Sequence, residues 1–156
     1  MKSEDDILAL DNQLCFALYA ANRAVTARYR PLLAELNLTY PQYLVMLVLW
    51  EADRDGRSVR VSYLGKRLRL DSGTLTPLLK RLAERGLVIR QRDTTDERVV
   101  TVALTGEGIA MRKRASDVPG RLLCGTGIDE ERIVALRDEL RSVLSLLEAE
   151  GEPSDR

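Results

Sequence analysis

The chain of 156 residues contains no histidine, two cysteines, one tryptophan and one phenylalanine. Without histidine, Ser-His-Asp and Cys-His catalysis are excluded, and a transition metal would find only two distant thiols and carboxylates as ligands. We therefore expect no catalytic residues, no metal site and no cofactor. Long apolar runs are also absent, because the longest, residues 44–50, is too short to cross a bilayer.

The length is that of one domain, or of one domain with an arm that completes its fold on a partner. The first ten residues, MKSEDDILAL, begin acidic and lack the basic and apolar order of a secretory signal. We therefore expect a cytoplasmic protein with no membrane partner. In that compartment, two cysteines more than a hundred residues apart indicate a transient, regulatory disulfide rather than a secreted-type framework.

The net charge of zero conceals an uneven distribution. Residues 54–98 hold twelve Lys and Arg against six Asp and Glu, whereas the rest of the chain holds twelve against eighteen. A basic middle between acidic flanks is typical of a protein whose central segment binds phosphate. The alternative is a basic face that only interacts with solvent.

Helical periodicity dominates the N-terminal part of the sequence. Apolar side chains recur at three- and four-residue steps in residues 5–30, which predicts one long amphipathic helix ended by Pro31. A short helical piece should follow to about Leu36. Thr39 and Gln42 form a capping box at the start of TYPQYLVMLVLWEAD, a helix that is apolar nearly all round and therefore central.

The middle of the chain has the order helix, turn, helix, hairpin. Residues 59–61 fit a brief strand, and SYLGKRLRL fits a short helix. LDSGTLTPLLKRLAERG is a second helix with Asp71 as its N-cap and Gly86 as its stop, loosened or kinked near Pro77. Beyond it, LVIRQR and RVVTVAL flank the polar tip DTTDE, which predicts a β-hairpin. The expected fold class is mainly α with a small β-hairpin wing, a winged helix-turn-helix.

Two further helices are expected after the hairpin. Thr105 caps the first, which Pro119 and Gly120 should end. PGRLLCGTG is then a glycine-punctuated connector. Asp129 begins a last long helix with an apolar stripe, which Gly151 should stop.

A winged helix-turn-helix places the N-terminal residues of its second helix in a major groove, while the hairpin follows the DNA backbone. Small hydroxyls near the helix start, cations further along it and arginines of the wing are the candidate contacts, and Arg98 beside the tip suits a narrow minor groove. The alternative is that the hydroxyls only cap the helix and the arginines only solubilise a strand. The candidate DNA-binding residues are Ser72, Thr74, Thr76, Lys80, Arg81, Arg90, Arg92, Asp96 and Arg98.

Cys15 lies in the middle of the first predicted helix. Reaction with a peroxide requires a thiolate, and an unperturbed cysteine has a pKa of about 8.5. The macrodipole contributes little in mid-helix, Asp11 one turn earlier opposes ionisation, and no Lys or Arg lies at i±3 or i±4. Tyr19, one turn later, is a local hydrogen-bond donor. The local sequence leaves two hypotheses open, a thiol activated by the fold or a small core residue.

The segment LDSGTLTPLLKRLAERGLVIRQRDTTDERVVTVALT resembles the winged-helix core of the MarR family of transcriptional repressors. Together with a cysteine helix containing LCFALYAA and followed by two tyrosines, it is similar to the organic hydroperoxide resistance regulators within that family, over residues 8–147. The tip departs from the family pattern, because Thr94 or Thr95 stands where many members have an arginine.

The resemblance implies a homodimer whose terminal helices interlock and whose two lobes bind an inverted-repeat operator in double-stranded DNA. The expected boundaries are N-terminal dimerisation helices in residues 1–38, the DNA-binding lobe in 39–104, C-terminal dimerisation helices in 105–151 and a tail in 152–156. Independently of the resemblance, the sequence predicts two long helices with apolar stripes. They carry more apolar surface than the core of one small lobe needs, which supports a dimer.

The resemblance also assigns roles at the redox site. It implies that Cys15 is the sensing thiol for organic hydroperoxide, and that Tyr29 and Tyr40 reach it from the partner subunit. With Tyr19 they form the expected thiol-activating pocket. In the two-cysteine type, Cys124 is the resolving thiol of an intersubunit disulfide. The alternative for Cys124 is a buried thiol without a redox role.

Two other functions are compatible with the sequence. One is a MarR-type repressor that a small phenolic or lipophilic ligand releases, with both cysteines passive. The other is a thiol peroxidase, which would use the same reactive cysteine but gives no role to a basic winged helix.

Overall fold

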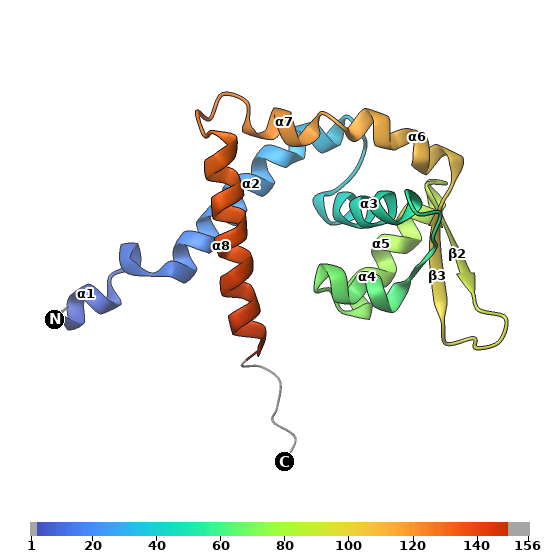
Figure 1. Ribbon diagram of the computed structural model, residues 1–156, viewed down its shortest axis with the longest axis horizontal. Helices are drawn as coiled ribbons and strands as arrows, with labels where there is room; N and C mark the ends of the chain where they lie inside the picture. The colour runs from blue at the N-terminus through green and yellow to red at the C-terminus, as the bar shows by residue number, and fades with distance from the viewer. Residues whose placement is uncertain (1–2, 150–156) are drawn as a thin grey trace, which may run out of the picture. The chain divides into compact units, whose positions relative to one another are not determined.

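The computed structural model describes residues 3–149. The described residues form two compact units, residues 3–122 and 123–149. The elements, labelled in Figure 1, are α1 (Glu4–Leu8), η1 (Leu10–Asn12), α2 (Leu14–Ala34), α3 (Tyr40–Asp53), β1 (Val59–Arg60), α4 (Val61–Leu68), α5 (Ser72–Glu84), β2 (Val88–Arg92), β3 (Val100–Leu104), α6 (Gly106–Ala115), α7 (Val118–Leu123) and α8 (Glu130–Ala149).

The core of the first unit forms around α3, whose side chains are buried on most of its circumference. The predicted capping box is present, since the Thr39 hydroxyl accepts from the Gln42 amide and the Gln42 side chain accepts from the Thr39 amide. Helices α4 and α5 pack with α3 beside the sheet, and the β2–β3 hairpin projects from this lobe (Figure 1). The expected winged helix-turn-helix is therefore confirmed.

The sheet contains three antiparallel strands in the order β1-β3-β2. Val102 at the centre of β3 is fully buried and pairs with Val59 on one side and Arg90 on the other. The brief strand predicted at residues 59–61 is thus the third strand of the wing, although it has only two residues.

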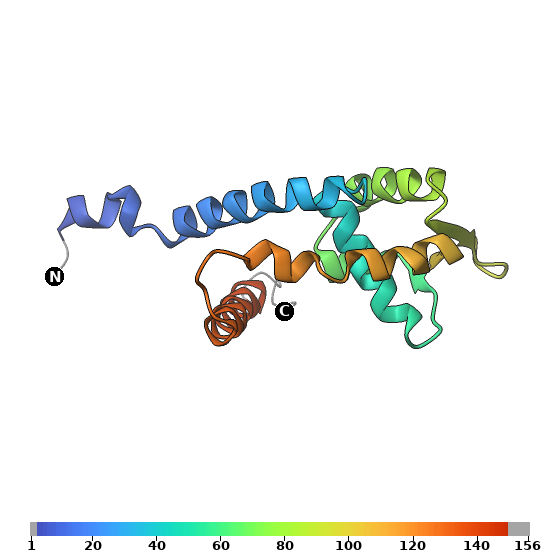
Figure 2. The ribbon, with the colours of Figure 1, turned by 90° about the horizontal axis from the view of Figure 1, so that it is seen from above.

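The single helix predicted for residues 5–30 is wrong at both ends. Its start is broken because the side chains of Asn12 and Gln13 donate to carbonyls of residues 6, 7 and 9, which ends α1 before α2 begins. Its end is not at Pro31, since α2 continues to Ala34 (Figure 2). Burial of Leu33 and Leu36 just beyond the proline offsets the backbone hydrogen bond that Pro31 cannot donate.

The region around Pro119 also differs from the prediction. Helix α6 ends at Ala115, and Pro119 is the second residue of α7, where its missing amide hydrogen would have no intrahelical acceptor. The segment expected to be an irregular connector from Pro119 onward is therefore helical up to Leu123. Only residues 124–129 link α7 to α8.

The second unit consists of this linker and α8, a helix of 20 residues. Asp129 caps the helix as expected, because its Oδ1 accepts from the Arg132 amide at 2.7 Å. Side chains of α8 are exposed or half-buried, with Leu136 60% exposed and Leu147 64% exposed. The expected stop at Gly151 and the tail lie outside the described residues.

Among the helices in residues 3–149, none has the length and apolar character needed to cross a membrane.

Gly108 is a test of the packing between α6 and the lobe. Its carbonyl accepts from Trp50 Nε1 at 2.9 Å, and a Cβ at this position would lie 2.1 Å from the Leu87 carbonyl oxygen. We expect Gly108→Ala to lower the free energy of unfolding by about 1–3 kcal/mol, since the clash forces backbone to move. Urea unfolding followed by Trp50 fluorescence measures it.

Gly106→Ala is the matched control, because nothing lies within 4 Å of a Cβ there. Equal stability of the two variants would contradict the proposed packing constraint.

Candidate DNA-binding surface and redox site

The start of α5 is fixed by Asp71, as predicted. Asp71 Oδ1 accepts from the Thr74 amide at 2.8 Å, and Oδ2 accepts from the Thr74 hydroxyl at 3.2 Å. These hydrogen bonds, the backbone one foremost, lower the pKa of Asp71. Of the three candidate hydroxyls at this end, that of Thr74 contributes to the cap, while Ser72 and Thr76 are exposed on the same first turns.

The turn between α4 and α5 depends on Arg69, which is not among the residues predicted from the sequence. Arg69 adopts a left-handed backbone with φ of 55°, and the Leu70 amide donates to the Gly65 carbonyl at 2.9 Å. A side chain at Gly65 would approach the Leu70 oxygen to 2.9 Å, so the close turn requires glycine there. Because Arg69 and not a glycine occupies the left-handed position, the sequence pattern does not predict this turn.

The wing tip is ordered by its two aspartates. Asp93 Oδ1 accepts from the Thr95 hydroxyl and from the amides of Thr95 and Asp96, and the hydroxyl bond is the main cause of its lowered pKa. Asp96 Oδ1 accepts from the Arg98 amide at 3.1 Å. Asp96 is thus placed to position Arg98 rather than to meet a phosphate.

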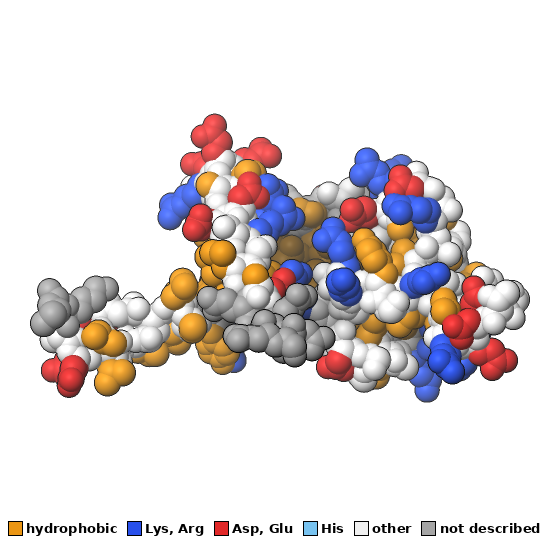
Figure 3. Space-filling view, turned by 60° about the horizontal axis from the view of Figure 1, so that its bottom comes forward, with side chains coloured by type: hydrophobic (Ala, Val, Ile, Leu, Met, Phe, Trp, Pro, Cys, Tyr) orange, Lys and Arg blue, Asp and Glu red, His pale blue; other side chains and the backbone are white. Residues whose placement is uncertain are grey.

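The arginines of the wing are exposed. Arg90 and Arg92 lie on β2, and Arg92 also donates to the Glu97 carbonyl at 3.3 Å. Arg98 shares a hollow of about 430 Å³ with Ser72 of α5 and Lys66 of α4, so the hairpin and the helix start are close together. Figure 3 shows Lys and Arg side chains distributed over the face of the lobe turned to the viewer.

The two cations predicted on the later part of α5 have different surroundings. Lys80 lies 4.0 Å from Glu84 in an exposed pair one turn apart. Arg81 lines a cavity with residues of α2 and α3. The structure therefore gathers Ser72 and Arg98, but it separates Arg81 from them by most of the length of α5.

Cys15 is an exposed thiol in the first turn of α2, not in the middle of a helix. The helix begins at Leu14, and Gln13 has a non-helical backbone, so Asp11 belongs to η1 and is not the helical neighbour that was expected. The positive end of a helix dipole favours a negative charge nearby. The apolar pattern excludes this contribution only because it predicts the helix start nine residues too early.

Tyr29 and Tyr40 form a half-buried aromatic pair with ring centroids 4.8 Å apart. Burial, and secondarily the neighbouring phenols of Tyr43 and Tyr40, raises the pKa of Tyr29 to about 12. Burial also raises the pKa of Tyr40 and, with Tyr40 nearby, that of Tyr43. These phenols therefore stay protonated at neutral pH and are available as hydrogen-bond donors. Tyr43, whose ring centroid lies 5.7 Å from that of Tyr29, joins this pair and is not among the site residues predicted from the sequence.

Tyr19 is separate from this pair. It lies one turn after Cys15 on α2, is 57% exposed, and its hydroxyl accepts from Arg23 Nη1 at 3.1 Å. Cys15 and Tyr29 are on the same helix, and at about 1.5 Å of rise per residue their Cα atoms are roughly 21 Å apart. Within one chain, the Tyr29–Tyr40 pair therefore cannot donate to Cys15.

Cys124 directly follows α7 and is exposed. Gly125 and Gly127 after it have φ of 76° and 70°, conformations that strongly favour glycine. Two residues before it, the Leu122 carbonyl accepts from Arg28 Nε at 2.9 Å, which ties the end of α7 to α2.

The C-terminal end of α2 is held by three arginines. Arg121 of α7 binds the Glu35 carboxylate through two hydrogen bonds of 2.7 and 2.8 Å, which lower the pKa of Glu35. Arg114 of α6 donates to the Glu35 carbonyl, and Arg85 at the end of α5 donates to the carbonyls of Leu36 and Asn37. Cations at a helix C-terminus are favourable, and these contacts join α2 to α5, α6 and α7.

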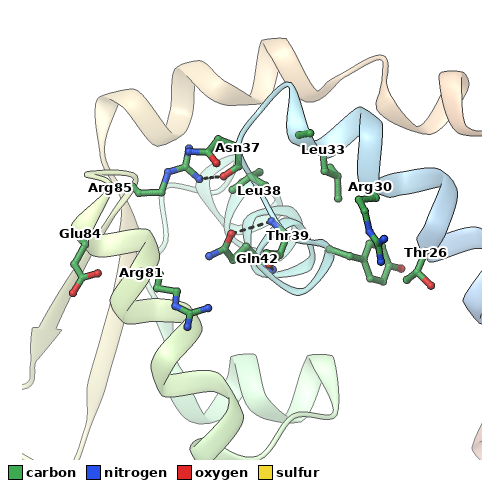
Figure 4. A pocket seen from close by; sticks show the side chains of 12 residues that line it. Thr26, Arg30, Leu33, Asn37, Leu38, Thr39, Gln42, Arg81, Glu84 and Arg85 are labelled. Atoms are coloured by element: carbon green, nitrogen blue, oxygen red, sulfur yellow. Dashed lines mark hydrogen bonds between the residues drawn. The ribbon is translucent and has the colours of Figure 1, made fainter.

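Beside this junction lies an open cavity of about 780 Å³ (Figure 4). It lies between the C-terminal part of α2, the start of α3 and the later part of α5. Its lining residues are Thr26, Arg30, Leu33, Ala34, Asn37, Leu38, Thr39, Tyr40, Gln42, Arg81, Glu84 and Arg85.

Comparison with known proteins bears on the function of these sites. Residues 27–114 match the family model described as transcriptional regulator SarA/Rot. The chain is 44% identical over 147 residues to the organic hydroperoxide resistance transcriptional regulator of Bacillus subtilis, covering 94% of this chain and 97% of that protein. The chain belongs to the MarR/SarA family of transcriptional regulators. The resemblance to the hydroperoxide resistance regulators is thereby confirmed.

Two other MarR/SarA relatives extend the comparison. The HTH-type transcriptional regulator TtmR of Methylorubrum extorquens is 50% identical over 145 residues, which cover 88% of this chain and 72% of that protein. AbfR of Staphylococcus epidermidis, solved as the reduced protein bound to DNA, superposes with a TM-score of 0.78 at 32% identity and covers 93% of this chain and 99% of that one. AbfR has also been solved in a disulfide form, with a TM-score of 0.65 over 93% of this chain and 97% of that one.

The Asp71 cap provides a test of the recognition helix of this MarR/SarA regulator. We expect Asp71→Ala to lower both the melting temperature and the affinity for operator DNA, because the first turn of α5 loses the acceptor for the Thr74 amide. Asp71→Asn retains an acceptor and is the control. Thermal unfolding and fluorescence anisotropy of labelled operator DNA measure the two effects.

The pH dependence follows from the lowered pKa of Asp71. The cap is fully present above the unfolded value of about 3.9 and is lost as the pH falls through the lower folded value. The difference in stability between wild type and Asp71→Ala should therefore be constant from pH 5 to 8 and shrink below about pH 4. A constant difference down to pH 2 would contradict this role.

Proposed function

We propose that the protein is a cytoplasmic, homodimeric repressor that binds an inverted-repeat operator when reduced and is released when organic hydroperoxide oxidises Cys15. The observation that carries the proposal is the distance between the candidate sensing thiol and the phenols expected to activate it. An exposed thiol stands in the first turn of α2, and a pair of protonated phenols stands roughly 21 Å away near the other end of the same helix.

A second copy of the chain would cover the exposed apolar side chains and would bring phenol donors to Cys15. Apolar side chains are exposed along α1, η1 and the start of α2, with Leu8 82% exposed and Leu14 62% exposed, and along α8. Burying them against the same elements of a partner removes this apolar surface from water. Two-fold pairing of antiparallel α2 helices would bring the thiol of one subunit to Tyr29 and Tyr40 of the other.

The oxidation step is a two-electron reaction at sulfur. The Cys15 thiolate attacks the terminal oxygen of the hydroperoxide, an S–O bond forms as the O–O bond breaks, and the alcohol leaves after taking a proton. Phenol donors at Tyr29 and Tyr40 stabilise the thiolate, because hydrogen bonds to a charged form favour that form. Tyr19 supports this site from the same helix.

Cys124 completes the reaction as the resolving thiol. Its sulfur attacks the sulfenic acid of the partner subunit's Cys15, an S–S bond forms and water leaves. The glycines after Cys124 permit the linker to change conformation. The disulfide form of AbfR is a precedent in a relative, and for this chain the bridge is part of the proposal.

DNA release follows from the contacts of α7 and α2. A bridge at Cys124 displaces the end of α7, which is tied to α2 through Leu122 and through the Arg121–Glu35 pair. The end of α2 is in turn tied to Arg85 at the end of α5. We propose that this displacement changes the separation of the two recognition helices, which in the reduced dimer match half-sites about 34 Å apart.

The DNA contacts in this proposal divide into two groups. Ser72 and Thr76 at the start of α5 and Arg98 beside the wing tip face bases, while other side chains fix the register on phosphates. The phosphate group comprises Thr74, Lys80, Arg90 and Arg92. Asp96 orients Arg98.

Variants of the two cysteines test the function. Wild type treated with cumene hydroperoxide should lose operator affinity by roughly a thousandfold or more, if only non-specific binding remains. Cys15→Ser should bind operator and ignore the peroxide. Cys124→Ser should accumulate sulfenic acid without a bridge. Fluorescence anisotropy and mass spectrometry provide the measurements.

Mixed dimers test the intersubunit bridge. A dimer of one Cys15→Ser chain and one Cys124→Ser chain retains one thiol of each kind, on different subunits. It should form a dimer-sized band on a non-reducing gel, reversed by dithiothreitol. A band only at monomer size for oxidised wild type would exclude the bridge, and release of Cys15→Ser by peroxide would refute Cys15 as the sensor.

The cavity of Figure 4 favours a second candidate, release by a small phenolic or lipophilic ligand with passive cysteines. In that case Cys15→Ser would respond to the ligand as wild type does. A thiol peroxidase would instead consume peroxide over many cycles in the presence of a reducing thiol, and we propose that this protein does not.

A further inference from the structure

Helix α2 begins without a capping side chain. Gln13 occupies the N-cap position, but its side chain accepts no hydrogen bond from the first turn. Within residues 3–149, the amides of Leu14, Cys15 and Phe16 have no acceptor, and the next amide, that of Ala17, donates to the Gln13 carbonyl at 3.2 Å. The first amides of a helix have no intrahelical acceptor and are normally satisfied by a cap or by water. Three free amides therefore surround the candidate sensing thiol.

The other long helices of the described residues are capped. Of the helices with ten residues or more in that part of the chain, α3, α5, α6 and α8 each begin at a side-chain oxygen that accepts from the first turn. The capping residues are Thr39, Asp71, Thr105 and Asp129. Threonine and aspartate are favoured N-cap residues. Helix α2 is the exception, and it is the helix that carries Cys15.

Two amide side chains next to this helix start are bound to the preceding segment instead. Asn12 Nδ2 donates to the Asp6 carbonyl at 2.7 Å, and Gln13 Nε2 donates to the carbonyls of Ile7 and Ala9 at 2.6 and 3.1 Å. Asparagine is itself a favoured N-cap residue. Because both side chains are used to close α1, neither caps α2.

We propose that Asn12 and Gln13 are positioning residues that keep the start of α2 uncapped, so that its amides are available to the Cys15 thiolate. An amide that donates to a cap is occupied, whereas free amides at a helix start stabilise a nearby anion and favour a thiolate. This inference rests on the proposed function, because it concerns the reactivity that peroxide sensing requires of Cys15. The contribution lies within one chain and is independent of the partner subunit's phenols.

The competing role for Gln13 is to hold α1 in place. In that case, loss of the side chain changes the reactivity of Cys15 whatever residue replaces it. An uncapped helix start predicts a different pattern, in which only a replacement that supplies a hydrogen-bond acceptor changes the reactivity. The two roles are therefore distinguished by the type of residue introduced at position 13.

The test compares capping and non-capping residues at this position. Gln13→Ser and Gln13→Asn introduce neutral, favoured N-caps, whereas Gln13→Ala loses the same contacts with α1 and supplies no acceptor. Alkylation of Cys15 by iodoacetamide is followed as a function of pH by mass spectrometry of the full-length protein, with Cys124→Ser in every variant so that one thiol reacts.

The capping variants should shift the midpoint of this pH profile upward. Below the midpoint they should react about fivefold more slowly than the protein with Gln13, with iodoacetamide and with cumene hydroperoxide alike, since a cap contributes roughly that factor. Well above the midpoint, where the thiol is ionised in every variant, they should lose this disadvantage. Gln13→Ala should keep the midpoint of the protein with Gln13.

Two further measurements exclude misfolding as the cause of a slower reaction. The melting temperature of the capping variants should be equal to or higher than that of the protein with Gln13, because an N-cap stabilises its helix. The affinity of the reduced variants for operator DNA, measured by fluorescence anisotropy, should be unchanged.

An unchanged midpoint in both Gln13→Ser and Gln13→Asn would overturn the inference and leave Cys15 as the sensor. An equal shift in Gln13→Ala and Gln13→Ser would also overturn it, and would assign Gln13 to the anchoring of α1. Failure of every hydroperoxide to oxidise Cys15 with Gln13 in place would instead overturn the proposed function, and the alkylation profile would still measure the effect of the cap.

Discussion

The rigidity of α2 is the constraint on which the redox site depends. A continuous helix from Leu14 to Ala34 fixes the distance between the thiol near its start and the aromatic pair packed against its later part. Because an α-helix cannot shorten, Cys15 and Tyr29 of one chain stay roughly 21 Å apart. Beyond Tyr29 the helix continues through Pro31, and burial of Leu33 anchors these last turns in the lobe. The proposed sensor therefore requires two chains.

The same helix is fixed to the lobe at its C-terminal end. Three guanidinium groups bind the residues just after α2, Glu35 to Asn37. Arg114 comes from α6 and Arg121 from α7, and Arg85 directly follows α5. Exposed ion pairs contribute little stability individually. Their importance here is geometric, because hydrogen bonds to backbone carbonyls fix direction as well as distance. In the proposed release, these contacts would transmit a movement of α7 or α2 to the end of α5.

The sequence predicted those features that depend on residues a few positions apart. The caps at Thr39, Asp71 and Thr105 and the wing hairpin all follow from such short-range patterns. The break before Leu14 could not be predicted from apolar periodicity, because the side chains of residues 12 and 13 end α1 by binding its carbonyls. Contacts between distant residues, such as those of Arg85 with the carbonyls just after α2 and of Arg121 with Glu35, depend on the tertiary fold.

The position of the helix start places Cys15 in surroundings that differ from those predicted from the sequence. From the sequence, the thiol had only an unfavourable aspartate and one local tyrosine near it. In the structure, the thiol lies where the unpaired amides of a helix favour negative charge, and burial keeps the phenols of Tyr29 and Tyr40 protonated as donors. Under the proposed pairing, only the first of these contributions exists in a single chain. The second requires the proposed dimer, which is also the form that we propose binds an inverted repeat. In the proposed function, reactivity toward peroxide and the ability to bind the operator would therefore arise from the same assembly.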